Sequence, residues 1–309
     1  MDVYDVAIIG GGPAGISAGI YAARFKLNAI IISNSLGGTA QSAHLIENYP
    51  GFGAVSGFEL MQKFREHLNL FEIPVLEKHV HSVSKENDNF IIKLNEQDVK
   101  AKYILIATGT KRRKLGVPGD AKFYGKGVSY CVTCDAFFYR GKTVAVVGGS
   151  DAANMGAILL ASMAEKVYII YRRDKLRGEL IWIDRVITNP KIEVLYNSTV
   201  TEVLGNEFVE GVKLEDGRII KVDGVFVEIG SIPECCCTNE LGVKLSEKGY
   251  IIVDSTQKTN IDRVYAAGDV TTGSNGFQQI LTAASEGVVA IKSIFDDIER
   301  SKGTLWKQK

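Results

Sequence analysis

The feature that most constrains the fold of this chain is a glycine-rich turn that occurs twice, each time between an apolar strand and a helix. Each copy consists of a strand, the turn, a helix and a second strand. The segments of the first copy are 4–9, 10–15 (GGGPAG), 16–24 and 28–33, and those of the second are 143–147, 148–153 (GGSDAA), 154–164 and 166–171. Strands that alternate with helices in this way predict an α/β fold with two Rossmann-like dinucleotide-binding domains.

The residue types within the turn indicate what it binds. In a dinucleotide-binding turn the first glycine permits a tight bend, and the second lets the backbone approach a pyrophosphate. The third position must be small so that helix and strand can pack, and amides at the helix N-terminus bind the phosphates. These positions are Gly10, Gly12 and Gly15 in the first copy and Gly148, Ser150 and Ala153 in the second. A single such turn can be merely structural, whereas two copies favour two nucleotide sites, for FAD and for NAD(P)H.

The end of the second strand, about 20 residues after the first glycine, discriminates between ligands. In the second copy this position lies in Tyr171 to Arg177 (YRRDKLR). Arg172, Arg173 and Arg177 suit a ribose 2′-phosphate, because guanidinium groups bind phosphate oxygens bidentately. A solvated basic turn is the alternative interpretation. In the first copy the position is Ser33, which lacks the acid that commonly holds a ribose 2′-hydroxyl.

Two cysteines, Cys131 and Cys134, form a C-x-x-C pair in the segment SYCVTCDAFFYRG. Such a pair can be half of a zinc site, a structural disulfide or a working redox pair. Zinc needs two further ligands, and the four histidines of the chain are scattered. C-x-x-C spacing lowers the pKa of one thiol, and the thiolate is the nucleophile in disulfide exchange. Asp135 follows directly and can handle a proton, so the pattern favours a redox pair.

Composition limits the partners and the cellular setting. The chain has 309 residues, enough for two domains, and its 36 basic residues balance 36 acidic ones, so we expect no nucleic-acid partner. No basic leader with a cleavage site precedes the first strand, and no apolar run approaches the roughly 20 residues of a membrane helix. Five cysteines do not form a disulfide scaffold in a chain of this length. We expect a cytoplasmic protein with no membrane contact.

A late segment returns the chain to its first domain. Residues 261–270 (IDRVYAAGDV) predict a strand that ends at Gly268 and Asp269. We expect the two crossovers at 116–119 (GVPG), which is rich in turn residues, and at 239–243. The expected domains are a discontinuous FAD-binding domain, residues 1–114 and 242–309, and an inserted NADPH-binding domain, residues 115–241, which carries the C-x-x-C pair.

Taken together, these segments resemble the low-molecular-weight thioredoxin reductases over essentially the whole chain. The resemblance rests on GGGPAG at 10–15, GG at 37–38, ENYPGF at 47–52, ATG at 107–109, CVTCD at 131–135, YRRDKLR at 171–177, AAGDV at 266–270 and QQILTAASEG at 278–287. Several of these motifs occur in other flavoproteins. The C-x-x-C-D directly before the second nucleotide turn is specific to this family and its close relatives.

The resemblance implies an NADPH-dependent enzyme in which electrons pass from NADPH to FAD, then to the Cys131–Cys134 disulfide, then to the disulfide of thioredoxin or a similar small redox protein. Cys134 would face the flavin, Cys131 would attack the partner disulfide, and Asp135 would act as general acid/base. The residues implied to bind FAD are Gly10, Gly12, Gly15, Gly38, Asn48, Thr108, Gly109, Asp269 and Gln279, and those implied to bind NADPH are Gly148, Ser150, Ala153, Arg172, Arg173 and Arg177. The family also implies a homodimer.

The chain departs from the family pattern at the NADPH turn. Ser150 replaces the second glycine, where a side chain crowds the pyrophosphate, and Met155 and Gly156 replace a glutamate pair that the family usually has. These departures support an alternative, an NADPH-independent flavin dithiol oxidase or a ferredoxin-fed disulfide reductase. A further alternative is a non-catalytic FAD-binding scaffold, which leaves the C-x-x-C-D motif unexplained.

Two other segments leave alternatives open. The run Cys235-Cys236-Cys237 is either an accessory redox relay or soft-metal trap, or a loop whose small, half-buried side chains are cysteine. Phe137, Phe138 and Tyr139 either dock thioredoxin or anchor their loop in the core, and we expect the anchor.

Overall fold

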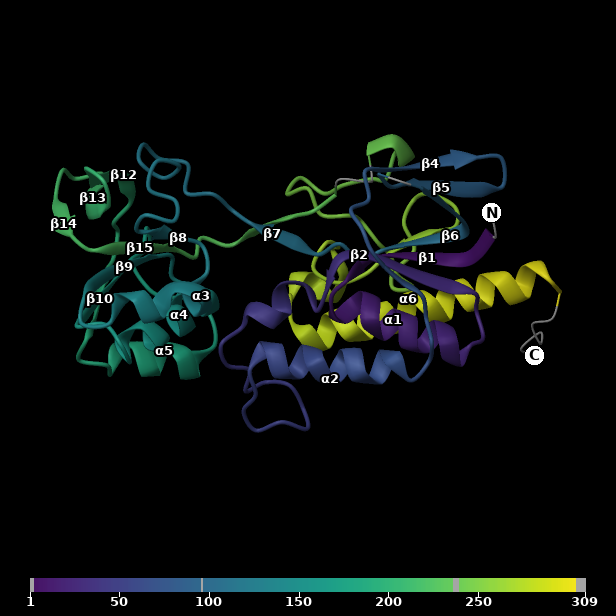
Figure 1. The fold of residues 1–309 in the computed structure, drawn as a ribbon, viewed down its shortest axis with the longest axis horizontal. Helices are drawn as coiled ribbons and strands as arrows, with labels where there is room; N and C mark the ends of the chain where they lie inside the picture. The colour runs from purple at the N-terminus through teal and green to yellow at the C-terminus, as the bar shows by residue number, and fades with distance from the viewer. Residues whose placement is uncertain (1–2, 96, 236–238, 304–309) are drawn as a thin grey trace. The chain divides into compact units, whose positions relative to one another are not determined.

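The computed structural model of the chain describes residues 3–95, 97–235 and 239–303 (Figure 1). The chain divides into two compact units. Unit 1 consists of Met1–Lys111 and Pro233–Lys309, and unit 2 consists of Arg112–Ile232. No helix within the described residues is long and apolar enough to cross a membrane.

Unit 1 is built on a seven-stranded sheet in the order β3-β2-β1-β6-β5-β4, with β17 also paired to β6. Strands β1, β2, β3, β6 and β17 pair in parallel, and β4 and β5 add an antiparallel hairpin. The strands are β1 (Val3–Gly11), β2 (Ala29–Leu36), β3 (Val75–Glu77), β4 (Ser82–Glu86), β5 (Asn89–Lys93), β6 (Asp98–Ile106) and β17 (Val264–Ala266). Each of the central strands β1, β2 and β6 contains a continuous buried apolar run, at residues 6–9, 29–32 and 103–106, as expected for a parallel sheet that is covered on both faces.

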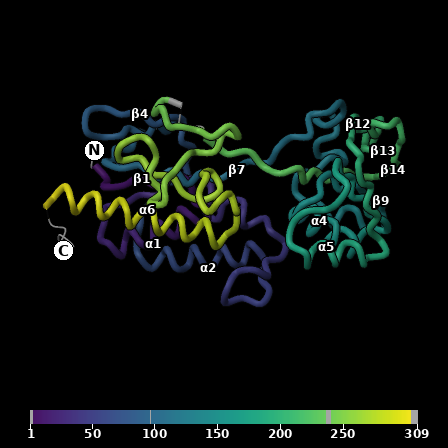
Figure 2. Tube along the Cα trace, turned by 180° about the vertical axis from the view of Figure 1, so that it is seen from behind, coloured from purple at the N-terminus to yellow at the C-terminus, as the bar shows by residue number. Residues whose placement is uncertain are grey.

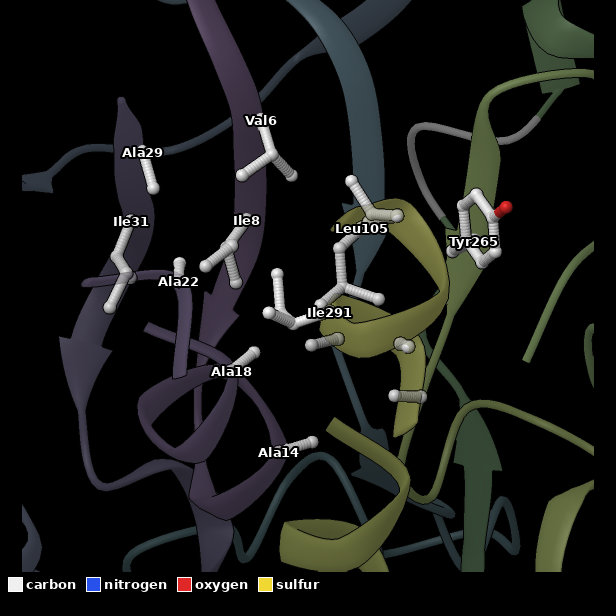
Figure 3. Packing of buried hydrophobic residues seen from close by; sticks show 14 of the residues in the cluster. Val6, Ile8, Ala14, Ala18, Ala22, Ala29, Ile31, Leu105, Tyr265 and Ile291 are labelled. Atoms are coloured by element: carbon white, nitrogen blue, oxygen red, sulfur yellow. The ribbon is translucent and has the colours of Figure 1, made fainter. Parts of the chain in front are cut away.

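Three helices of unit 1 lie along one face of this sheet, namely α1 (Pro13–Arg24), α2 (Gly57–Asn69) and α6 (Ile280–Ser301) (Figures 1 and 2). Ile8 on β1 pairs with Ile31 on β2. The buried cluster in Figure 3 contains these two side chains, Leu105 of β6 and Tyr265 of β17 from the sheet, together with residues of α1 and α6. Ala14, Ala18 and Ala22 line the inner face of α1 in that cluster. Their small side chains let α1 approach both the sheet and α6, because no large group keeps the backbones apart.

Unit 2 repeats this arrangement with a five-stranded parallel sheet in the order β11-β10-β9-β15-β8. Its strands are β8 (Val128–Ser129), β9 (Thr143–Val147), β10 (Lys166–Ile170), β11 (Ile192–Leu195) and β15 (Gly224–Val227), and its helices are α3 (Val132–Asp135), α4 (Asp151–Ala161) and α5 (Leu180–Ile187). A separate antiparallel sheet contains β12 (Val200–Gly205), β13 (Val209–Leu214) and β14 (Ile219–Lys221). In both units the glycine turn follows the central strand and leads into a helix, α1 in unit 1 and α4 in unit 2, which confirms the predicted α/β class.

The segments that connect the units are β7 (Thr110–Arg112) and β16 (Ser231–Pro233), which pair with each other as a two-stranded sheet. The division therefore falls before both expected crossovers. The glycines at 116–119 belong to a turn inside unit 2: a side chain on Gly119 would lie 2.2 Å from the carbonyl oxygen of Val203 on β12. The turn over 116–119 is thus packed within unit 2, whereas the two segments that connect the units are the extended strands β7 and β16.

The structure corrects the limits of some predicted elements. The strand expected over 261–270 is only the three residues of β17, because a turn precedes it and Gly268 has a left-handed φ of 79°. The helix after the second glycine turn ends at Ala161 rather than Ala164. Cys236 and Cys237 lie outside the described residues, and Cys235 is half-buried with its Sγ 3.5 Å from the carbonyl oxygen of Gly249.

Candidate functional site

The first glycine turn brings α1 into direct contact with the sheet. Gly10 has a φ of 116°, and a Cβ on it would lie 2.1 Å from the carbonyl oxygen of Ala107 on the neighbouring segment. A Cβ on Gly15 would lie 1.9 Å from the carbonyl oxygen of Gly10, so the third position admits only glycine here. A Cβ on Gly12, by contrast, would meet only Gly38 at 4.0 Å. The turn therefore leaves the space at the N-terminus of α1 open to a ligand, as a pyrophosphate site requires.

A second glycine loop lies against this space. Gly37 and Gly38 both have left-handed φ values, 105° and 58°, and a Cβ on Gly38 would lie 3.0 Å from the Cα of Gly12. Arg65 of α2 holds the loop, since its guanidinium donates to the carbonyl oxygen of Leu36. The sequence predicted Gly38 as a site residue but gave no signal for Arg65, which lies 29 positions beyond the carbonyl that it holds.

Ser33 at the end of β2 has a defined structural role. Its Oγ accepts a hydrogen bond from the amide of Gly11 at 2.9 Å and donates to the carbonyl oxygen of Ser35 at 2.8 Å. The hydroxyl at the place where an acid commonly holds a ribose is therefore engaged with the backbone of the turn.

Four further predicted FAD ligands lie in unit 1. The amide of Asn48 donates to the side chain of Gln279 at 3.1 Å, across 231 positions of sequence. Gln279 is the N-cap of α6, in a reciprocal capping box with Thr282. Thr108 donates its hydroxyl to the carbonyl oxygen of Glu234, and a Cβ on the next residue, Gly109, would meet nothing within 4 Å.

Asp269 is the half-buried carboxylate at the end of the late strand. Among the described residues, no hydrogen-bond donor reaches its side chain, although Gln278 holds its backbone carbonyl at 2.9 Å. Burial, together with the charge of Glu286, raises the pKa of Asp269 to about 6. A half-buried carboxylate without a donor fits a ligand that supplies hydroxyl groups, because buried acceptors need partners.

The second glycine turn, in unit 2, has the same steric requirement at its first position. Gly148 has a φ of 143°, and a Cβ on it would lie 2.1 Å from the carbonyl oxygen of Glu228. Ala153 is fully buried, as the third position requires. Ser150 is the N-cap residue of α4, and Asp151 places an acid in the first turn of that helix. This acid opposes an anionic ligand at the helix N-terminus.

The predicted arginines lie on a segment that folds back onto this turn. The amide of Arg177 donates to the carbonyl oxygen of Gly149 at 2.8 Å, and Asn154 donates to the carbonyl oxygen of Arg177 at 3.0 Å. The amide of Glu179 donates to the carboxylate of Asp151 at 2.7 Å. The side chains of Arg172, Arg173 and Arg177 are exposed. The fold thus holds three cationic side chains on a segment bonded to the glycine turn.

Cys131 and Cys134 form a disulfide at the start of α3 in unit 2. Cys131 is the N-cap of this short helix, and its Sγ accepts a hydrogen bond from the amide of Cys134 at 3.3 Å. The Oγ of Ser129 accepts a hydrogen bond from the amide of Cys131 at 3.0 Å. In this structure Cys134 is exposed and Cys131 is half-buried. No cluster of metal ligands occurs among the described residues, so the zinc alternative gains no ligands from the fold.

A buried network holds the backbone on the N-terminal side of this pair. The hydroxyl of Tyr130 donates to Asp120 at 2.7 Å and accepts from the amide of Leu115 at 2.8 Å, while Asp120 also accepts from the amide of Gly116 at 2.8 Å. Burial, with the charge of Asp120, raises the pKa of Tyr130 to about 12. The residue next to Cys131 is thereby tied to the turn over 115–120.

α4 packs directly against the helix that carries the disulfide. A Cβ on Gly156 would lie 2.9 Å from Cγ2 of Val132, the residue after Cys131. Gly156 occupies the second position at which the family usually has a glutamate. Val132 packs against it and leaves no room for a longer side chain there.

The aromatic residues after the pair differ from the expectation that all three anchor the loop. Tyr139 does so, with its ring 5.1 Å from that of Phe226 in an edge-to-face arrangement. Phe137 and Phe138 are 66% and 69% exposed. Only Ala136 separates them from the half-buried Asp135, so two large apolar side chains lie in solvent close to the disulfide in sequence.

Comparison with known proteins places these features in a family. The family model described as pyridine nucleotide-disulphide oxidoreductase matches residues 4–287. A thioredoxin reductase of Mycoplasma genitalium is 39% identical, over 96% of this chain and 96% of that protein. The crystal structure of the T. acidophilum thioredoxin reductase matches with a TM-score of 0.91 at 37% identity, over 96% of this chain and 99% of that one. A ferredoxin-flavin thioredoxin reductase from Clostridium acetobutylicum matches with a TM-score of 0.55 at 35% identity, over 98% and 99% of the two chains.

The Tyr130 network generates a stability prediction. Tyr130→Phe removes the hydroxyl and leaves buried Asp120 with fewer donors, so the free energy of unfolding should fall by about 1–3 kcal/mol. Urea denaturation at pH 7 measures the change. Tyr124→Phe is the matched control, because Tyr124 is exposed and its hydroxyl should contribute less than about 0.5 kcal/mol. Equal effects of the two substitutions would show that the network does not stabilise unit 2.

Proposed function

Because this chain belongs to the pyridine nucleotide-disulphide oxidoreductase family, and within it to the thioredoxin reductases, we propose that it passes electrons from NADPH through FAD to the Cys131–Cys134 disulfide and on to thioredoxin or a similar small redox protein. The observation that carries the proposal is the disulfide itself, at the N-terminus of α3 and packed through Val132 on the helix of a nucleotide turn. A non-catalytic scaffold would leave this disulfide without a role.

Unit 1 supplies the residues that we propose to hold FAD. The open space at Gly12, at the N-terminus of α1, suits its pyrophosphate, and the Asp269 carboxylate suits the hydroxyls of its ribityl chain. Gly10, Gly15, Asn48, Thr108, Gly109 and Gln279 complete the proposed set. When bound, FAD accepts an electron pair from the nicotinamide and delivers it to a disulfide.

The protein's own sulfur atoms carry the next step. The reduced pair has two thiols, and the thiolate of one attacks the disulfide of the partner, so that a mixed disulfide forms and one partner thiol leaves. Attack by the second cysteine releases the other partner thiol and restores the Cys131–Cys134 disulfide. We assign the first attack to Cys131. Its sulfur accepts a hydrogen bond from the amide of Cys134, and such a bond stabilises a thiolate. Cys134 would face the flavin, and Asp135 would exchange the thiol proton.

The exposed aromatic pair supports a protein as the electron acceptor. Phe137 and Phe138 offer apolar surface beside the disulfide, and exposed aromatic residues are enriched where proteins bind each other. We further propose that the protein acts as a homodimer in the cytoplasm, as the family resemblance implies.

Anaerobic titration of the FAD-loaded protein with NADPH tests the whole scheme. The visible flavin absorbance should bleach with NADPH and return when oxidised thioredoxin is added. Bleaching without recovery would mean that thioredoxin is not the acceptor. An unchanged spectrum in NADPH would refute the proposed donor.

A second candidate function is an NADPH-independent enzyme, either a ferredoxin-fed disulfide reductase or a flavin dithiol oxidase. Ser150 and Asp151 favour it, because a side chain and an acidic group both oppose a pyrophosphate at the N-terminus of α4. The similarity to the ferredoxin-flavin thioredoxin reductase is in line with this candidate. In the same titration, bleaching by reduced ferredoxin or by a dithiol, but not by NADPH, would identify it.

The arginine segment generates a specificity prediction. Arg172→Ala with Arg173→Ala should lower the ratio of kcat/KM for NADPH to that for NADH by about tenfold or more, because the 2′-phosphate loses its charge-assisted hydrogen bonds. Steady-state kinetics with both nucleotides measures the ratio. Lys175→Ala, an exposed cation on the same segment, is the control and should change the ratio less. Unchanged kinetics with both nucleotides would refute the role of the arginines.

Asp269 generates a prediction about pH. The pKa of its carboxyl rises from 3.8 to about 6 on folding, so the unfolded chain loses this proton first and the apo-protein loses stability as pH rises from about 4 to 6. Asp269→Asn should therefore raise the free energy of unfolding by about 1–3 kcal/mol at pH 8 and by much less at pH 4. The same variant should bind FAD more weakly. Urea unfolding of the two apo-proteins at pH 4 and pH 8 measures the stability difference, and an FAD titration measures the affinity. An equal gain in the free energy of unfolding at the two pH values would contradict the prediction.

A further inference from the structure

Glu286 is a buried carboxylate on α6 whose position is fixed by backbone packing. A Cβ on the next residue, Gly287, would lie 2.1 Å from the carbonyl oxygen of Ala14, so α6 meets the first turn of α1 with no intervening side chain. Glu286 is only 6% exposed. No lysine or arginine among the described residues pairs with it, which is unusual for a buried acid.

Neutral donors from one turn of unit 1 satisfy this carboxylate instead. Its Oε2 accepts from the amide of Gly268 at 2.7 Å and from the hydroxyl of Thr271 at 3.2 Å. Its Oε1 accepts from the hydroxyl of Ser274 at 2.5 Å. A Cβ on Gly273 would lie 2.5 Å from Oε1, so the backbone of the turn closes directly over the carboxylate.

The turn that Glu286 holds, residues 268–274, contains backbone conformations that need support. Gly268 has a φ of 79°, and Ser274 has a φ of 47°, which is unfavourable for a residue with a side chain. The three hydrogen bonds hold both ends of the turn, and Asp269 lies between them. After burial, the charge of Glu286 is the second cause of the raised pKa of Asp269, and no other charged group contributes to that rise.

We propose that Glu286 is a positioning residue for FAD: its buried carboxylate holds the turn 268–274 in the conformation that presents Asp269 to the hydroxyls of the ribityl chain. This inference rests on the function proposed above. Glu286 touches the turn rather than the ligand, so its effect on FAD passes through Gly268, Thr271 and Ser274.

FAD binding to the apo-protein, followed by quenching of flavin fluorescence, separates the contributions of Glu286. Glu286→Ala removes three hydrogen bonds to the turn and should raise the Kd for FAD by about 10–100-fold. Glu286→Gln keeps an amide oxygen for Gly268 and Thr271 and an amide group that can donate to Ser274. At pH 8 its Kd should stay within about threefold of the wild-type value. Asp296→Ala, on the same helix but in a surface pair with Lys292, is the control and should leave the Kd unchanged.

The pH dependence of binding gives a readout that a merely structural role would not move. If ionised Asp269 accepts the ligand hydroxyls, FAD affinity falls as the pH is lowered through the pKa of Asp269, about 6. Glu286→Gln removes a like charge and lowers that pKa. The loss of FAD affinity should then occur at lower pH in this variant than in the wild type.

The outcomes distinguish failure of the inference from failure of the proposed function. Wild-type apo-protein that does not bind FAD would refute the proposed function. Wild-type binding with an unchanged Kd in Glu286→Ala, even if its thermal stability is lowered, would overturn the positioning role alone. Should Glu286→Ala not fold, the double variant Thr271→Val and Ser274→Ala removes two of the same hydrogen bonds, and an unchanged Kd there would also overturn it.

Discussion

Close approach of backbone segments around the end of the central strand is the constraint on which both nucleotide turns depend. In unit 1 any side chain at Gly10 or Gly15 would collide with a backbone carbonyl, and in unit 2 the same holds at Gly148. These collisions are with backbone rather than flexible side chains, so no rearrangement of neighbours can relieve them. Helices α1 and α4 therefore begin just after the central strand of their units, where the free amides of the helix N-terminus can bind an anionic ligand.

The same kind of close packing places the disulfide. Val132, within the C-x-x-C segment, fills the space above Gly156 of α4, while Tyr130 and Ser129 hold the backbone before Cys131. Gly156, at one of the two positions where the family usually has a glutamate, is thus required by the packing of Val132. In this chain, the helix that opens at the nucleotide turn is also the surface on which the disulfide helix rests.

The repeated pattern was predictable because it is local. Strand, turn and helix follow one another within about 25 residues, and their apolar periodicity and glycines are visible in the sequence. The Gly268-Asp269 motif and the C-x-x-C pair were visible for the same reason. The bonds of Glu286 to Gly268, of Tyr130 to Asp120 and of Arg65 to Leu36 were not predicted, since each joins residues that only the folded chain brings together. Phe137 and Phe138 were expected in the core because sequence alone cannot tell which members of an aromatic run find a partner.

The two nucleotide turns differ in where they place acidic groups, and this difference predicts how each binds phosphate. The first turn of α1 contains no acid of its own, although the turn 268–274, which carries Asp269, and the helix α6, which carries Glu286, both pack against it. The first turn of α4 contains Asp151, whose charge offsets part of the positive potential at that helix N-terminus. The nucleotide that we propose to bind at α4 would therefore depend more on Arg172, Arg173 and Arg177, so a 2′-phosphate that reaches these side chains should contribute a larger share of the binding energy there than in a turn without the acid.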